Sequence, residues 1–141
     1  MDIALLTGQR PADVLKLQCA DIRDGALFVA QSKTGAKRAI ELLGELAEVI
    51  ERVSSRPRVR RSAFLIQDDD GKPLSLLALR GRFDKARKAA GVSFQFRDIR
   101  AKTASDTGDL AHSQRLLGYR NRDMTEHYVR ERVGQRVRPL R

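Results

Sequence analysis

Apolar residues along this chain recur mainly at the spacing of α-helices. The clearest case is residues 45–53, where the apolar positions share one helical face: Leu46, Val49, Ile50 and Val53. Spacing, capping residues and stop signals predict further helices over residues 1–6, 11–22, 76–91, 97–108, 111–119 and 122–130. The chain is therefore expected to be mostly helical.

One part of the chain has strand character instead. Residues 25–31 and 38–42 are rich in strand formers, and residues 32–37 between them contain a glycine. This pattern predicts a β-hairpin. Residues 63–67 also read as a short strand. The expected fold class is α+β, mostly α-helical with a small antiparallel sheet near the N-terminus.

Arg10 stands between a glycine turn and Pro11. The first turn of a helix accepts proline, because the N–H that proline lacks has no partner there. Arg10 is therefore expected to start a helix, with its side chain free to project. Taken alone, such an arginine is most simply a solvated surface charge.

Composition changes that picture. The 141 residues fit one domain, and 28 Lys and Arg against 18 Asp and Glu give a net charge of +10. This surplus favours a polyanionic partner, most simply nucleic acid, over a generically basic protein. Aromatic residues make up only 5% and tryptophan is absent. Phosphate contacts by Arg and Lys are thus a better candidate binding mode than base stacking.

The cysteine and histidine content argues against a metal centre. Cys19 is the sole cysteine, which excludes an intramolecular disulfide, and it is interpreted as a small buried hydrophobe. His112 and His127 are too few for a histidine metal site. A long apolar run and a signal-peptide pattern are both absent from the sequence. A cytoplasmic protein without a membrane partner is expected.

Four segments carry candidate catalytic residues and follow one another along the chain: residues 7–22 with Arg10, 29–42 with Lys33, 96–106 with Arg100, and 116–130 with Tyr128. Together they resemble the arginine, lysine and tyrosine boxes of the tyrosine recombinases, specifically phage integrase catalytic domains. The resemblance covers nearly the whole chain. It implies the DNA breaking-rejoining catalytic fold, with residues 1–141 as a single catalytic domain that lacks the family's first helix and upstream DNA-binding domains.

The resemblance also implies a chemistry. Tyr128 would be the nucleophile that forms a 3′-phosphotyrosyl intermediate, which preserves the bond energy without ATP, metal or any other cofactor. Arg10 and Arg100 would clamp the phosphate, because each guanidinium donates two parallel hydrogen bonds and stays charged. Lys33 would be the general acid for the leaving 5′-oxygen. Lys37 in the same hairpin is a competing candidate for that role.

Two positions depart from the family pattern. Arg97 stands where the second arginine box usually has histidine, and Tyr119 stands where the last box usually has histidine or tryptophan. Both are retained as catalytic candidates, because each can hydrogen-bond a phosphate oxygen, although imidazole is lost from both places. Asp13 is either a supporting residue for Arg10 or an acid favoured by the helix dipole.

The leading hypothesis is a site-specific recombinase of the integrase type. A catalytically defective remnant that only binds DNA and a type IB topoisomerase-like enzyme remain alternatives. The expected partner is double-stranded DNA carrying attachment-type sites, bound as a homo-tetramer, with a monomer or weak oligomer in its absence and a nucleoid-associated location in the cytoplasm. Candidate DNA-backbone contacts are Lys37, Arg58, Arg60, Arg80, Arg82, Lys85 and Lys102.

Overall fold

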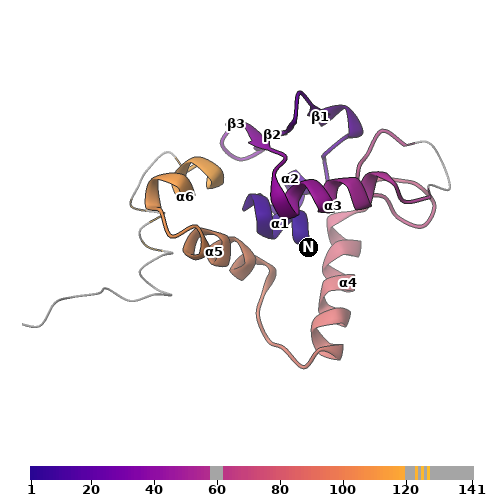
Figure 1. The fold of residues 1–141 in the computed structure, drawn as a ribbon. Coiled ribbons are helices and arrows are strands. Elements are labelled where there is room, and N and C mark those ends of the chain that lie inside the picture. Colours follow the sequence, from indigo (N-terminus) through magenta and orange to yellow (C-terminus); the bar gives the residue numbers. More distant parts are fainter. Residues whose placement is uncertain (58–61, 120–122, 124, 126, 128–141) are drawn as a thin grey trace, which may run out of the picture.

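The computed structural model describes residues 1–57, 62–119, 123, 125 and 127, and within them it is helix-rich with one small sheet (Figure 1). The helices are α1 (Asp2–Thr7), α2 (Pro11–Val14), the 3₁₀ helix η1 (Cys19–Asp21), α3 (Gly44–Ser54), α4 (Leu76–Ala89), α5 (Phe96–Asp106) and α6 (Leu110–Leu117). The strands are β1 (Ile22–Arg23), β2 (Ala26–Ala30) and β3 (Lys37–Glu41). The predicted α+β class is confirmed.

The sheet is antiparallel, in the order β1-β2-β3. Strands β2 and β3 form the predicted hairpin, with Ala30 opposite Lys37 next to the turn. Its turn closes through two backbone bonds, from Gln31 N to Ala36 O and from Gly35 N to Gln31 O, both of 2.9 Å. The two-residue strand β1 was not predicted, because so short a strand leaves no alternating pattern to detect.

The core lies between the sheet, α1, α3 and α5. Leu27 of β2 is fully buried, and the α3 face is buried at the predicted positions Leu46, Val49 and Ile50, while Val53 is half-buried. Burial of each such side chain is worth about 1.5–3 kcal/mol. Helix α5 packs against both α1 and α6, which brings the second half of the chain against the first (Figure 1).

Helix α4 lies to one side of this assembly (Figure 1). Its start follows the sequence signal, because the hydroxyl of Ser75 accepts a hydrogen bond of 3.1 Å from Ala78 N. The helix is anchored by Phe83, which is buried against Phe94 and Phe96 with ring centroids 5.6 and 5.1 Å apart. Phe83 also belongs to the hydrophobic core, whereas Arg80, Arg82 and Lys85 of the same helix are exposed.

Three predictions near the N-terminal half need correction. The helix predicted over residues 11–22 ends at Val14, because the Gln18 N–H is taken by the Asp21 carboxylate at 2.8 Å, which starts η1 instead. Cys19, expected to be buried, is half-buried at the start of η1. The strand predicted over residues 63–67 is replaced by two isolated bridges, Gln18 with Phe64 and Gln67 with Pro73.

The helix predicted over residues 122–130 lies largely outside the described residues. In the described part of the chain, every helix is too short or too polar to cross a lipid bilayer.

Candidate active site

Arg10 sits at the N-terminus of α2, as its flanking residues predicted. Helix α1 ends at Gly8 in the left-handed conformation, and Pro11 then occupies the first position of α2 with Arg10 as its N-cap. The arginine does not project freely, however. It is half-buried, and its buried Nη1 has no hydrogen-bond partner among the described residues. An unsatisfied guanidinium nitrogen is costly unless an anionic ligand completes it.

Lys33 lies at the tip of the β2–β3 turn and is exposed. Its two neighbours are held. Ser32 N donates to Asp13 Oδ1 at 2.9 Å, and Thr34 Oγ1 donates to Gln31 Oε1 at 2.8 Å. The lysine side chain is therefore carried by an anchored turn, while its ammonium remains accessible to solvent.

Arg97 and Arg100 lie one turn apart in α5. The helix starts with a capping box, in which Gln95 N donates to Asp98 Oδ2 at 2.7 Å. Arg100 is half-buried and donates from Nη2 to Leu117 O at 2.6 Å and from Nε to Tyr119 Oη at 3.1 Å. Its guanidinium also lies 4.8 Å from the centroid of the Tyr119 ring. These contacts orient the guanidinium from two sides.

Five of the six predicted catalytic residues line one cavity of about 300 Å³. They are Arg10, Lys33, Arg97, Arg100 and Tyr119, and the remaining lining residues are Gln9, Pro11, Phe96 and Ile99. Four cations thus converge from three separate segments, and the described lining contains no carboxylate. Such a hollow suits a phosphate group, because charge-assisted bonds from Arg and Lys to anionic oxygens are strong where water is limited. Tyr128 lies outside the described residues.

Asp13 contacts the lysine turn and does not line the cavity. It is only 2% exposed, and its Oδ1 accepts the bond from Ser32 N, while its buried Oδ2 has no hydrogen-bond partner among the described residues. An acid that only complements a helix dipole would face solvent. The geometry therefore assigns Asp13 a contact with the segment that carries Lys33.

Of the predicted DNA-backbone residues, those that the structure describes do not line this cavity. Lys37 is exposed at the start of β3, and it does not line the cavity as Lys33 does. Arg80, Arg82 and Lys85 are exposed on α4, where Arg82 forms an ion pair of 3.4 Å with Asp69. Lys102 on α5 forms an ion pair of 2.7 Å with Asp106 and lines a different pocket. Arg58 and Arg60 lie outside the described residues.

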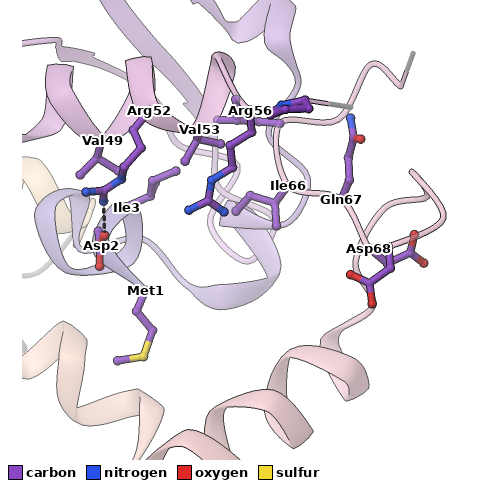
Figure 2. Close-up of a pocket in the computed structure, with 13 residues that line it drawn as sticks. Met1, Asp2, Ile3, Val49, Arg52, Val53, Arg56, Ile66, Gln67 and Asp68 are labelled. Atoms are coloured by element: carbon purple, nitrogen blue, oxygen red, sulfur yellow. Dashed lines mark hydrogen bonds and ion pairs between the residues drawn. The ribbon is translucent and has the colours of Figure 1, made fainter. Parts of the chain in front are cut away.

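A larger pocket of about 540 Å³ lies between α1, α3 and residues 65–69 (Figure 2). An ion pair of 2.7 Å between Arg52 and Asp2 crosses part of it. This pocket contains none of the predicted catalytic or DNA-binding residues. Across the described residues, no group of three or more His, Cys, Asp and Glu side chains is placed to hold a metal ion.

Two buried glutamines beside the cavity were missed by the sequence analysis. Gln9 and Gln31 are both 2% exposed, and Gln31 Nε2 donates to Gln9 Oε1 at 2.7 Å. A signal was present in the strand pattern. Leu27 and Val29 point inward, so Gln31 continues the inward-facing alternation as a polar residue. A polar side chain at such a position needs buried partners.

Comparison with known proteins gives one family. The sequence model of the phage integrase family matches residues 1–134. The integrase of Escherichia phage HK022 is 33% identical over 91% of this chain, and that of Escherichia phage lambda is 32% identical over 94%. The chain spans about two fifths of the length of these relatives, 39% and 40% respectively.

Solved structures agree with the sequence relatives. A lambda integrase dimer bound to a COC′ core site superposes with a TM-score of 0.81 at 29% identity, covering 98% of this chain and 53% of that one. A lambda integrase tetramer bound to a Holliday junction gives a TM-score of 0.81 at 28% identity, covering 97% and 43%. The lambda integrase catalytic core gives 0.72 at 32% identity, covering 83% and 79%.

Proposed function

Because the chain belongs to the phage integrase family, we propose that it cleaves and rejoins DNA as a site-specific recombinase through a 3′-phosphotyrosyl intermediate. The observation that carries the proposal is the shared cavity of Arg10, Lys33, Arg97, Arg100 and Tyr119. These residues are far apart in sequence, and a purely structural role would not require four cations to face one hollow. A DNA phosphate supplies the negative charge that this arrangement lacks.

In the proposed reaction the Tyr128 oxygen attacks the phosphorus, a Tyr128–phosphorus bond forms, and the bond from phosphorus to the 5′-oxygen breaks. The phenol proton passes to solvent, and Lys33 donates a proton to the departing 5′-oxygen. Arg10 and Arg100 hold the non-bridging oxygens, where the transition state gathers charge. Each such donor is worth roughly 10²–10³ in rate. The reverse sequence, with a 5′-hydroxyl as nucleophile, reseals DNA.

Arg97 and Tyr119 adapt the pocket to the loss of imidazole. The Tyr119 hydroxyl accepts a hydrogen bond from Arg100 Nε, and a phenol can also donate one hydrogen bond to a phosphate oxygen. Arg97 adds a permanent cation to the same cavity. The proposed site therefore stabilises charge through guanidinium and phenol groups, and proton transfer to the leaving group depends on Lys33.

Double-stranded DNA is the proposed partner, with assembly into a tetramer on DNA and a cytoplasmic location. The lambda integrase structures, bound to a core site as a dimer and to a Holliday junction as a tetramer, support the DNA partner and the assembly on DNA. Arg80, Arg82 and Lys85 on α4, together with Lys37, Arg58, Arg60 and Lys102, are the proposed backbone contacts. Such contacts orient the duplex without reading its sequence.

A covalent trapping experiment tests the proposal. The chain is incubated with nicked duplexes that carry a randomised segment, so that cleavage beside the nick releases a short strand and prevents resealing. We expect a protein–DNA adduct that survives denaturation with the wild type and disappears with Tyr128→Phe. The matched Tyr119→Phe variant keeps the nucleophile and should form the adduct more slowly. An adduct that persists in Tyr128→Phe would overturn the assignment.

A second function has one observation in its favour, because neither Arg97 nor Tyr119 carries the imidazole that the family pattern has in those positions. A DNA-binding module without chemistry would retain the cationic cavity and the basic helix α4. It would retard the same duplexes in a gel without leaving any covalent adduct. The trapping experiment therefore separates the two functions directly.

A further inference from the structure

One buried side-chain amide joins the residue before Arg10, the lysine turn and the end of α6. Gln31 Nε2 donates to Gln9 Oε1 at 2.7 Å and to Leu117 O at 2.9 Å, and Gln31 Oε1 accepts from Thr34 Oγ1 at 2.8 Å. Gln31 is 2% exposed, so these bonds form where water cannot replace them. Every hydrogen of the amide nitrogen and one lone pair of the oxygen are used.

The partners of this amide connect Lys33 to the arginines. Gln9 precedes Arg10 and also donates from Nε2 to Leu116 O at 2.9 Å. The carbonyl of Leu117 accepts a second bond, from Arg100 Nη2 at 2.6 Å. Thr34 follows Lys33 in the turn. A displacement of the Gln31 amide would therefore move Lys33 relative to the guanidinium groups of Arg10 and Arg100.

The backbone of Gln31 also closes the lysine turn. Its N–H donates to Ala36 O and its carbonyl accepts from Gly35 N, each at 2.9 Å. Without the side-chain amide, those two backbone bonds would still form a turn, but the turn would lose its attachment to Gln9 and to the end of α6. The side chain thus helps to set where the turn lies, together with the bond from Ser32 N to Asp13, whereas the backbone sets its shape.

We propose that Gln31 is a positioning residue, whose buried amide fixes the lysine turn against the arginine-bearing segments so that Lys33 reaches the leaving oxygen. The inference rests on the proposed function, because it takes Lys33 as the general acid. It assigns to Gln31 no contact with DNA. The reacting groups remain Tyr128 and the four cations of the cavity.

The decisive substrate carries sulfur in place of the bridging 5′-oxygen. Its sequence is that of a duplex that formed an adduct in the covalent trapping experiment. A thiolate leaves without needing a proton, whereas an alkoxide needs one. A defect confined to Lys33 therefore disappears on the sulfur substrate. A defect in folding, in DNA binding or in the arginine clamp persists on both substrates.

Gln31→Met keeps the length of the side chain and removes all three hydrogen bonds. We expect cleavage of the oxygen substrate to fall about 10- to 100-fold, as misplacement of a reacting group by about 1 Å does, with KM for DNA unchanged. Cleavage of the sulfur substrate should stay within about threefold of wild type. Thr34→Val should show the same pattern more weakly, and the conservative Thr34→Ser should restore the wild-type rate.

The matched control is Gln67→Met. Gln67 is half-buried and its Nε2 donates to Phe64 O at 2.9 Å, so this variant loses a glutamine hydrogen bond away from the cavity. We expect unchanged rates on both substrates. If Gln67→Met slows the oxygen substrate as much as Gln31→Met does, the positioning role is overturned.

Lys33→Ala separates this inference from the function on which it rests. If sulfur does not rescue Lys33→Ala, the proposed role of Lys33 fails. If sulfur rescues Lys33→Ala but not Gln31→Met, the positioning inference alone fails. Hydrogen exchange gives a readout that needs no cleavage: Gln31→Met should speed exchange of the Ser32 and Gly35 amides and leave those of α3 unchanged. Unchanged exchange in the turn would also overturn the inference.

Discussion

Gly118 and Gln31 pack so closely that a Cβ atom at position 118 would lie 2.4 Å from Oε1 and 2.7 Å from Nε2 of Gln31. Gly118 also ends α6 in the left-handed conformation, with φ 72°. The glycine after the two leucines of the last sequence box therefore does two things. It terminates the helix, and it leaves room for the amide that contacts the lysine turn.

Gly118→Ala should destabilise the protein more than a left-handed backbone alone explains. Gly108 provides the matched control, because its φ is +65° and a Cβ there would meet nothing within 4 Å. We expect Gly108→Ala to cost about 1–2 kcal/mol in the free energy of unfolding. Gly118→Ala should cost about 1–3 kcal/mol more, because the added methyl overpacks the site. Urea unfolding measures both, and equal losses would contradict the packing argument.

Local sequence patterns predicted the helices and strands that are defined by interactions between residues close in sequence. The α3 face, the β2–β3 hairpin and the start of α4 at Leu76 all follow from residue spacing or from a single side-chain bond. The end of α2 did not follow, because Val14 is succeeded by apolar residues that equally suit a longer helix. What ends the helix is the bond between Gln18 N and the Asp21 carboxylate, together with the pairing of Cys19 N with Ala63 O.

The sequence predicted the cationic residues of the candidate site, but not the buried residues that hold them in place. Arg10, Lys33 and Arg100 stand in segments that resemble known boxes, so the sequence pointed to them directly. Gln9 and Gln31 lie in the same segments, but they carry no charge and the resemblance assigns them no role. Their importance arises from burial and from long-range hydrogen bonds. Gln31 bonds to Gln9, which is 22 positions away, and to Leu117, which is 86 positions away, and no local sequence pattern contains such pairs.

Asp13 offers a test of the second anchor of the lysine turn. Asp13→Ala leaves the Ser32 N–H without its acceptor, which should cost about 1–3 kcal/mol. Asp13→Asn retains Oδ1 and should cost less. Urea unfolding of the two variants, with exchange of the Ser32 amide as a local readout, measures the difference. If alanine and asparagine prove equally destabilising, the bond to Ser32 N is not what Asp13 contributes.

Titration of Asp109 should account for part of the loss of folding stability at low pH. Backbone N–H groups of His112 and Ala111 lower the pKa of Asp109 below its usual 3.8, as expected for the N-cap of α6. A lowered pKa in the folded state stabilises the protein above the unfolded value, and that stability is lost as pH falls through the folded value. Asp109→Asn keeps a capping oxygen and removes the titration.

Unfolding free energies of wild type and Asp109→Asn, measured from pH 7 down to about pH 2, check this. The two curves should differ in slope only below about pH 4, where the wild type loses stability more steeply. Curves of identical shape across that range would show that the Asp109 carboxylate does not stabilise α6 through its charge.

Helix α4 should contribute to DNA affinity through phosphates. Arg80→Gln and Lys85→Gln each remove an exposed cation. If each contacts one phosphate, the slope of log K against log salt should fall by about 1 per variant, equally for unrelated duplexes. Arg23→Gln is the control, because the Arg23 guanidinium lies 3.9 Å from the Phe28 ring centroid and belongs to another surface. A slope unchanged in the α4 variants would remove this helix from the DNA interface.

Arg100→Lys should separate charge from geometry in the cavity. The guanidinium of Arg100 reaches Leu117 O and Tyr119 Oη at once, through nitrogens that point in different directions. An ammonium keeps the charge but is a single compact group, so it cannot hold both contacts and also face a phosphate. We expect the rate of covalent adduct formation to fall roughly 10²–10³-fold, with DNA affinity nearly unchanged.

Arg52→Lys is the matched control for this change, since Arg52 is exposed on α3 and pairs with Asp2 outside the cavity. Its adduct formation should match the wild type. If DNA affinity falls while the rate at saturating DNA is unchanged, Arg100 binds the ground state and the transition state equally, because only differential binding changes the rate of the bound complex. A lysine at position 100 that cleaves at the wild-type rate would mean that charge alone suffices, and that the orientation imposed by Leu117 and Tyr119 has no part in catalysis.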